Sequence, residues 1–126
     1  DPELCLRVLG SATFTSLVPT HYAMMLDIPA GRRGNITSVE KLVVSSATAF
    51  ATTKRQIMEM FPNSGLYELY GSTEAGFVTI LHPDEQFDHL GTLCLEVFGS
   101  APIRLLDDSG NEVPDGAPGE LFSCSP

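Results

Sequence analysis

The pattern of apolar and polar positions divides the chain into two parts of different character. Up to residue 81, segments with helical spacing of apolar residues alternate with short apolar runs that are typical of strands. From residue 82 onward the helical spacing disappears, glycines and prolines become frequent, and only short strand signals remain. We therefore predict an α/β unit over residues 1–81, with alternating helices and mostly parallel strands, and the beginning of a small β subdomain over residues 82–126. Both would be parts of one larger domain.

The first predicted helix opens the chain. Asp1 can cap it, and Pro2 suits its first turn. Three apolar residues fall at helical spacing and form its expected buried face: Leu4, Val8 and Leu9. Gly10 can end the helix.

Two further helices are predicted in the first part. Thr20 can cap a short helix that runs to Leu26, and Thr52 or Thr53 can cap a longer one. The longer helix carries a stripe of three residues expected to be buried: Ile57, Met60 and Phe61. The segment 27–35 contains proline and glycines, so it is expected to be a loop.

Six short runs predict strands. They comprise residues 13–18, 42–44, 66–70, 77–81, 103–106 and 120–123. Between the last two, residues 107–110 have the composition of a tight turn.

Composition and charge exclude several classes of protein. The 126 residues include 7 Lys plus Arg and 16 Asp plus Glu, a formal net charge of -9. This excess argues against binding to a nucleic-acid polymer, which requires a basic face, and against an anionic membrane surface. A phosphate-bearing ligand would therefore be held by local donors and a metal ion. No run of about 18 apolar residues is present, so no membrane span is predicted.

The three cysteines and the two chain ends indicate the context. Cys5, Cys94 and Cys124 are far apart and form no CxxC pair, which predicts reduced thiols in a cytoplasmic protein. The chain opens directly on a helix signal and stops just after a strand signal. We interpret both ends as cut, which predicts a fragment.

The segment most informative about chemistry is Tyr70-Gly71-Ser72-Thr73-Glu74. It follows a predicted strand, at the sheet edge where open α/β proteins bind ligands. Gly71 would let the backbone turn and approach a ligand, while two hydroxyls beside a carboxylate suit a phosphate and its magnesium. Taken alone, the same five residues also fit an ordinary strand and turn with a capping glutamate.

Five segments read together resemble a known family. Residues 17–20, 45–49, 70–74, 110–114 and 119–121 have the order and spacing found in the adenylate-forming superfamily of acyl-CoA synthetases, aryl-CoA ligases, luciferases and peptide-synthetase adenylation domains. The resemblance covers nearly the whole chain and implies the α/β fold of the large N-terminal domain. It implies that a carboxylic acid attacks the α-phosphate of ATP, giving an acyl-adenylate and pyrophosphate, and that a thiol, usually coenzyme A (CoA), then takes the acyl group.

The resemblance also assigns roles to individual residues. Tyr70 would lie against adenine, Thr73 would meet the α-phosphate, and Glu74 would hold Mg2+. Thr73 and Glu74 are thus the expected catalytic residues. The remaining expected contacts of ATP or AMP are Ser45, Ser46, Ala47, Gly71 and Ser72.

The chain departs from the family in one loop and lacks three parts. Ser45-Ser46-Ala47-Thr48 stands where a Gly-Gly-Ala-Pro-like sequence is common, so a narrower or more polar pocket is expected. The phosphate loop with its lysine, the Thr-Gly-Asp motif and the C-terminal domain with its catalytic lysine are missing. Positioning supplies much of the catalysis in such chemistry, so we predict that this chain alone is inactive.

Other readings and residues stay open at this point. A non-catalytic α/β module that binds a nucleotide or a protein is the alternative function, and exposed sheet edges would favour self-association of a fragment. The acid, and the choice between CoA and a carrier-protein arm, are undetermined. A histidine metal site (His21, His82, His89) is disfavoured by the spacing. Arg32 and Arg33 are expected in a solvated loop, with contact to a CoA phosphate as the alternative.

Overall fold

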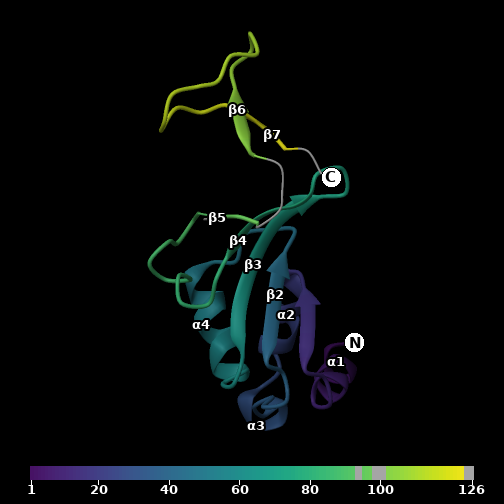
Figure 1. The fold of residues 1–126 in the computed structure, drawn as a ribbon. Coiled ribbons are helices and arrows are strands. Elements are labelled where there is room, and N and C mark those ends of the chain that lie inside the picture. The colour runs from purple at the N-terminus through teal and green to yellow at the C-terminus, as the bar shows by residue number, and fades with distance from the viewer. Residues whose placement is uncertain (93–94, 98–101, 124–126) are drawn as a thin grey trace.

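A computed structural model of the protein describes residues 1–92, 95–97 and 102–123 (Figure 1). Its body is a five-stranded sheet in the order β1-β2-β3-β4-β5. The strands are β1 (Phe14–Leu17), β2 (Lys41–Ser45), β3 (Gly65–Ser72), β4 (Gly76–Leu81) and β5 (Leu95–Glu96). The first three strands are parallel, and β4 and β5 each run antiparallel to the strand before them. The predicted α/β fold, with helices between the parallel strands, is confirmed.

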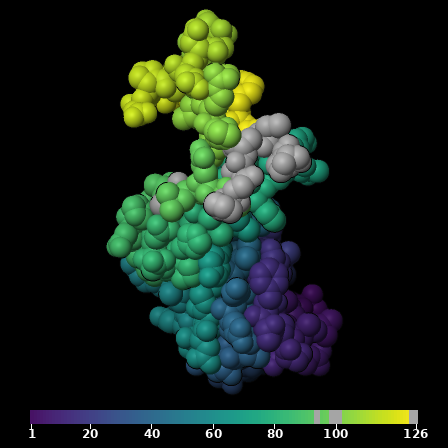
Figure 2. Space-filling model, viewed as in Figure 1, coloured from purple at the N-terminus to yellow at the C-terminus, as the bar shows by residue number. Residues whose placement is uncertain are grey.

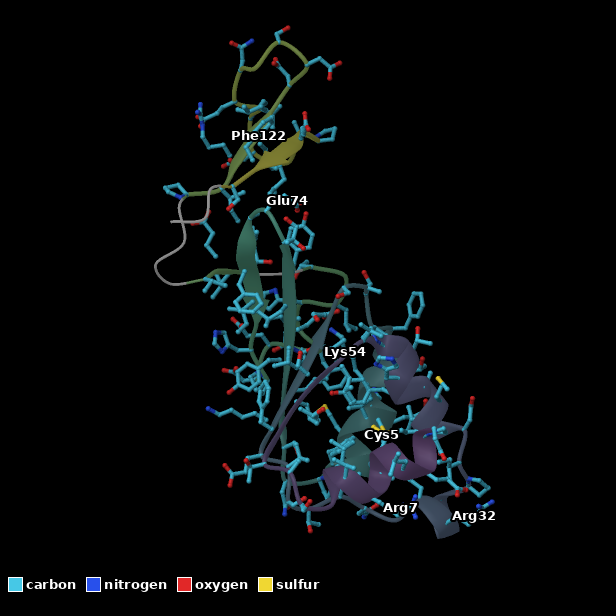
Figure 3. All side chains as sticks on the ribbon, turned by 90° about the vertical axis from the view of Figure 1, so that its right-hand side faces the viewer. Cys5, Arg7, Arg32, Lys54, Glu74 and Phe122 are labelled. Carbon is cyan, nitrogen blue, oxygen red and sulfur yellow. The ribbon has the colours of Figure 1, made fainter. Side chains whose placement is uncertain are left out.

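The helices lie together on one side of the sheet (Figure 3). They are α1 (Pro2–Leu9), α2 (Pro19–Leu26), α3 (Ala30–Arg33) and α4 (Ala51–Met60). The core lies between them and the sheet, and β2 is buried over Leu42, Val43 and Val44 because it is an interior strand. Tyr22 of α2 crosses this core: its hydroxyl donates to the Val43 carbonyl at 3.3 Å, and burial raises its pKa far above the ordinary value.

Helix α1 confirms the predicted cap and corrects the predicted face. The Asp1 carboxylate accepts from the backbone N–H of Glu3 at 2.9 Å. Leu4 and Val8, however, are 51% and 59% exposed, whereas Leu9 is 5% exposed. The helix docks through Leu9 and the partly buried Cys5, which are four residues apart and therefore share a face.

The predicted threonine caps are wrong. Helix α2 begins at Pro19, so its N-cap is Val18, and α4 begins at Ala51, so its N-cap is Phe50; neither makes a side-chain capping bond. Both helices begin two residues earlier than an N-cap at Thr20 or Thr52 would require. The buried stripe predicted for α4 is confirmed, because Ile57, Met60 and Phe61 are at most 1% exposed.

The segment 27–35 is not entirely a loop, because it contains the short helix α3. Arg33 at the end of α3 donates from Nη1 to the Leu26 carbonyl at 2.8 Å and so satisfies the C-terminal end of α2. Arg32 pairs with Glu3 of α1. Arg33 therefore makes a specific structural contact, whereas the Arg32 side chain stays 68% exposed, as expected for a solvated position.

A second sheet projects from the body, as Figure 2 shows for the light green and yellow residues. It pairs β6 (Arg104–Leu106) with β7 (Glu120–Phe122) in antiparallel fashion. The predicted turn after β6 is confirmed: the Gly110 N–H donates to the Asp107 carbonyl at 2.9 Å. Strand β5 lies after residue 81, yet it pairs with β4 of the first sheet. The division of the chain into an α/β part and a β-rich part at residue 81 stays a prediction.

Within the described ranges, no helix combines the length and hydrophobicity needed to cross a membrane. Cys5 is a free thiol, and Cys94 and Cys124 lie outside the described residues, so the reduced state of the three cysteines stays a prediction. The cytoplasmic location stays a prediction.

Candidate functional site

The segment Tyr70–Glu74 lies at the end of a β-hairpin. β3 continues through Ser72, two residues beyond the predicted end, and residues 73–75 form the turn into β4. Ser72 opposes Gly76 across the hairpin, and the Ala75 N–H donates to the Ser72 hydroxyl at 3.0 Å. The turn is therefore closed by a side chain of the motif itself.

Glycine is required at two positions of this hairpin for different structural reasons. Gly76 has a φ of 66°, a left-handed conformation that suits glycine. Gly71 lies beside an irregularity in the β3–β4 register, and a Cβ there would overlap the Gly76 carbonyl, only 3.1 Å from its carbon. Close packing of the two strands therefore requires Gly71, and the sharp turn expected at Gly71 belongs to Gly76.

An open pocket of about 490 Å³ lies between the end of β2 and the β3–β4 hairpin. Its lining residues are Ser45, Ser46, Leu69, Gly71, Ser72, Thr73, Gly76 and Phe77. The structure thus brings together five of the residues expected to bind the nucleotide. They meet because the carboxyl ends of the neighbouring parallel strands β2 and β3 lie at the same sheet edge.

Three other expected residues lie outside this pocket. Ala47 is exposed in the 46–50 loop, and Glu74 is exposed at the tip of the hairpin, at the end of the molecule that carries Phe122 (Figure 3). Tyr70 lines a separate pocket of about 170 Å³ with Leu121 and Phe122. Side chains alternate along a strand, so Tyr70 points to the face opposite Leu69.

The Glu74 carboxylate has the charge state that a cation ligand needs. Hydrogen bonds from its own backbone N–H and from the Ser72 hydroxyl lower its pKa below the ordinary value. The group is fully exposed and is therefore ionised at neutral pH. In residues 1–92, 95–97 and 102–123, no three His, Cys, Asp or Glu side chains gather in a way that could hold a metal ion.

An ion pair that the sequence analysis missed lies behind the pocket. Lys54 Nζ is 2.6 Å from Glu68 Oε2, and the two side chains are 2% and 3% exposed. The other carboxylate oxygen of Glu68 accepts from the Ala49 N–H at 3.1 Å. The spacing contained the signal: Lys54 is three residues before the buried Ile57 on α4, and Glu68 is two residues after the buried Leu66 on β3.

The 46–50 loop contains one unusual backbone conformation. Ser46 has a φ of 69°, the only positive φ of a residue other than glycine in the part of the chain that the structure describes. A side chain disfavours this region, so the surroundings must hold the loop there.

The remaining sequence candidates lie elsewhere. His21 is exposed in a pocket of about 210 Å³ that Cys5 also lines, and the His82 ring packs edge-on against Tyr67 at 5.7 Å. Arg32 lies at the end of the molecule opposite Glu74 (Figure 3). None of the three lines the pocket of about 490 Å³ between β2 and the hairpin, which we call the hydroxyl-rich pocket.

Comparison with known proteins identifies one family and several relatives of this chain. The family described as AMP-binding enzyme matches residues 1–126. The chain is 27% identical to 4-coumarate–CoA ligase 2 of Solanum tuberosum in an alignment of 133 positions, gaps included, that covers 94% of this chain and 24% of that ligase. It is 41% identical to the long-chain-fatty-acid–CoA ligase of Escherichia coli over 61 residues, 48% of this chain and 11% of that ligase.

Solved structures share the fold. O-succinylbenzoate coenzyme A synthetase from Bacillus subtilis, in complex with ATP and magnesium ion, superposes with a TM-score of 0.82 at 19% identity. The match covers 99% of this chain and 26% of the synthetase. The chain therefore spans about a quarter or less of the length of these three relatives.

Proposed function

This chain belongs to the AMP-binding enzyme family, and on that premise we propose that the complete protein carrying it is an ATP-dependent acid–thiol ligase. A carboxylate oxygen of the acid attacks the α-phosphorus of ATP, and pyrophosphate leaves. A thiolate then attacks the acyl carbon of the adenylate and releases AMP. The observation that carries this proposal is the single pocket that unites Ser45 and Ser46 with Gly71, Ser72 and Thr73.

The pocket suits a phosphate by neutral hydrogen bonding. None of its eight lining residues is charged, and four of them are hydroxyl residues: Ser45, Ser46, Ser72 and Thr73. We assign Thr73 to the α-phosphate, because hydroxyl donors can follow the charge that builds on phosphate oxygens as the new bond forms. Phe77, which is 67% exposed, supplies an apolar surface at the same pocket for the ring or chain of the acid.

The donor set at the hairpin tip fits magnesium. The ionised Glu74 carboxylate and the neighbouring hydroxyls of Ser72 and Thr73 are hard oxygen donors of the kind that Mg2+ prefers. Mg2+ bound there would neutralise phosphate charge. A single carboxylate is sufficient, since Mg2+ commonly combines one or two protein carboxylates with phosphate oxygens and waters.

We keep Tyr70 as the proposed adenine contact. Gly71 and Ser72 line both the hydroxyl-rich pocket and the smaller pocket that contains Tyr70 and Phe122, so the two pockets adjoin. The Tyr70 and Phe122 rings are 40% and 46% exposed and offer flat apolar faces to a base. A nucleotide would then extend from the smaller pocket toward Thr73.

CoA is the proposed thiol substrate. Support comes from the activities that give two relatives their names, the 4-coumarate–CoA and long-chain-fatty-acid–CoA ligases. They act on an aryl and a fatty acid respectively, so we propose an acyl or aryl acid without naming one. This chemistry needs no nucleic-acid polymer, and we propose a cytoplasmic location where ATP and CoA are available.

The test is acid-dependent exchange of labelled pyrophosphate into ATP by the complete protein, with a panel of fatty and aryl acids. We expect exchange with at least one acid, and a loss of about 100-fold in Thr73→Ala, the size seen when one transition-state donor is removed. Thr52→Ala is the matched control, because Thr52 is exposed on α4 and caps nothing. Nucleotide binding without exchange for any acid would instead support the non-catalytic binding module.

A further inference from the structure

The Glu68 carboxylate ties two parts of the chain together from inside the fold. Oε2 pairs with Lys54 Nζ at 2.6 Å, and Oε1 accepts from the Ala49 N–H at 3.1 Å. Both oxygens are thus occupied, and both side chains are at most 3% exposed. Lys54 belongs to the first turn of α4 and Ala49 to the preceding loop, so one residue of β3 holds the loop and the helix that follows it.

This tie lies directly behind the hydroxyl-rich pocket. Glu68 opposes Val44 on β2, and the next pair along the strands is Ser45 and Leu69, which both line the pocket. Only Ser46, Ala47 and Thr48 separate this pair from the tethered Ala49. Ser45 and Ser46 form one side of the pocket, which we call the Ser45–Ser46 wall. Its position therefore depends on a short loop that is held by β2 at one end and by the Ala49–Glu68 hydrogen bond at the other.

Ser46 is the residue of that loop whose backbone conformation depends on the hydrogen bond between Ala49 and Glu68. Its φ of 69° is disfavoured for any residue with a side chain, so a released loop would relax toward negative φ. The helix start offers no local substitute, because the N-cap Phe50 makes no side-chain bond.

We propose that Glu68 is a positioning residue for the nucleotide pocket, with Lys54 as its buried counter-ion. Its bond to the Ala49 N–H holds Ser46 in the left-handed conformation and so sets the distance between the Ser45–Ser46 wall and Thr73. This inference rests on the proposed function, because it assigns the pocket to ATP. It concerns binding geometry and gives Glu68 no contact with the substrate.

Two double variants of the complete protein separate positioning from charge burial. Lys54→Met with Glu68→Gln removes both charges and keeps an oxygen that can accept from Ala49. Lys54→Met with Glu68→Met removes both charges and the acceptor, with nearly the same side-chain shape. We call the first the Met–Gln variant and the second the Met–Met variant. Loss of one net hydrogen bond predicts a KM for ATP about fivefold higher in the Met–Met variant than in the Met–Gln variant, with kcat changing less.

Adding Ser46→Gly to the Met–Met variant provides the readout that a purely structural role would not move. Ser46→Gly also removes one hydroxyl of the pocket, so it is added to the Met–Gln variant as well, in which the acceptor for Ala49 is kept. Glycine adopts the left-handed conformation without that hydrogen bond, so the difference in KM between the two variants should shrink when both carry Ser46→Gly. If the Met–Met and Met–Gln variants have equal KM values, or if Ser46→Gly leaves the difference between them unchanged, the positioning role is wrong. A Met–Met variant that fails to fold, beside a folded Met–Gln variant, would also overturn it, since the acceptor would then serve folding.

The proposed function fails separately. If the unmodified complete protein neither binds ATP nor exchanges pyrophosphate with any acid, the fault lies with the assignment of the pocket to ATP. If that protein is active and the variants behave alike, only the role of Glu68 is refuted.

Discussion

Lys54 of α4 and Glu68 of β3 form an ion pair of 2.6 Å with both side chains almost completely buried. A charge at such a site is tolerated only while its partner is present, because desolvation of an unpaired ion is costly. The pair therefore couples the stability of the sheet to the loop that borders the candidate site.

Lys54→Met should be more destabilising than the double change Lys54→Met with Glu68→Gln. The single variant leaves the Glu68 carboxylate buried and unpaired, which should lower the free energy of unfolding by about 3–5 kcal/mol. The double variant carries no buried charge and should recover most of this loss. Urea unfolding followed by circular dichroism measures both, and equal losses would mean that the pair does not interact in solution.

Gly71→Ala should destabilise the β3–β4 hairpin. A Cβ at this position overlaps the Gly76 carbonyl, so backbone must move, at a cost of about 1–3 kcal/mol. Gly31→Ala is the matched control, because a Cβ at Gly31 meets nothing within 4 Å. Thermal unfolding compares the two, and an unchanged melting temperature for Gly71→Ala would contradict the observed strand register.

Ser72→Ala should raise the pKa of Glu74 toward its ordinary value, although the N–H of Glu74 itself remains a donor. The folded-state pKa of Glu74 is lowered, so the stabilisation from its ionised form is present above the unfolded-state pKa and is lost as pH falls through the folded-state pKa. Side-chain carboxyl chemical shifts recorded against pH measure the change. Asp107, whose pKa is lowered by hydrogen bonds from Asn111 and its neighbours, should titrate as before.

Glu74→Gln in the complete protein should raise the Mg2+ concentration needed for half-maximal ATP binding. The amide keeps the size of the side chain but removes the negative charge that attracts the cation. Asp108→Asn, in the exposed turn after β6, is the control for a change in overall charge. A Mg2+ requirement that moves equally in both variants would remove Glu74 from the proposed site.

The isolated chain should self-associate through β1, one of the two edge strands of the five-stranded sheet. Phe14 on this strand is 56% exposed, and an unpaired edge with an apolar side chain favours pairing with another copy. Light scattering should give masses above 13.6 kDa that rise with concentration, and Phe14→Lys should reduce them. Phe50→Lys, at an exposed loop residue, should have less effect; a monomer at every concentration would refute the idea.

Local signals in the sequence determined much of the architecture. Alternating apolar periods predicted the helices and parallel strands, and the caps and turns at Asp1 and Asp107 form as their side chains predict. These features depend on neighbours within a few positions, so a linear pattern contains them. The same holds in part for the motif Tyr70–Glu74, which was expected after a strand and occupies the last three residues of β3 and the turn that follows.

Only the tertiary structure decided which faces and partners these elements use. Leu4 and Val8 have the spacing of a buried face, yet α1 packs through Cys5 and Leu9 because docking on α2 selects the face. The predicted threonine caps are wrong because each helix begins two residues earlier than a cap at Thr20 or Thr52 requires. The Lys54–Glu68 pair is formed only when α4 lies across β3. Burial and charge pairing arise from segments distant in sequence, and for that reason the order of residues alone does not show them.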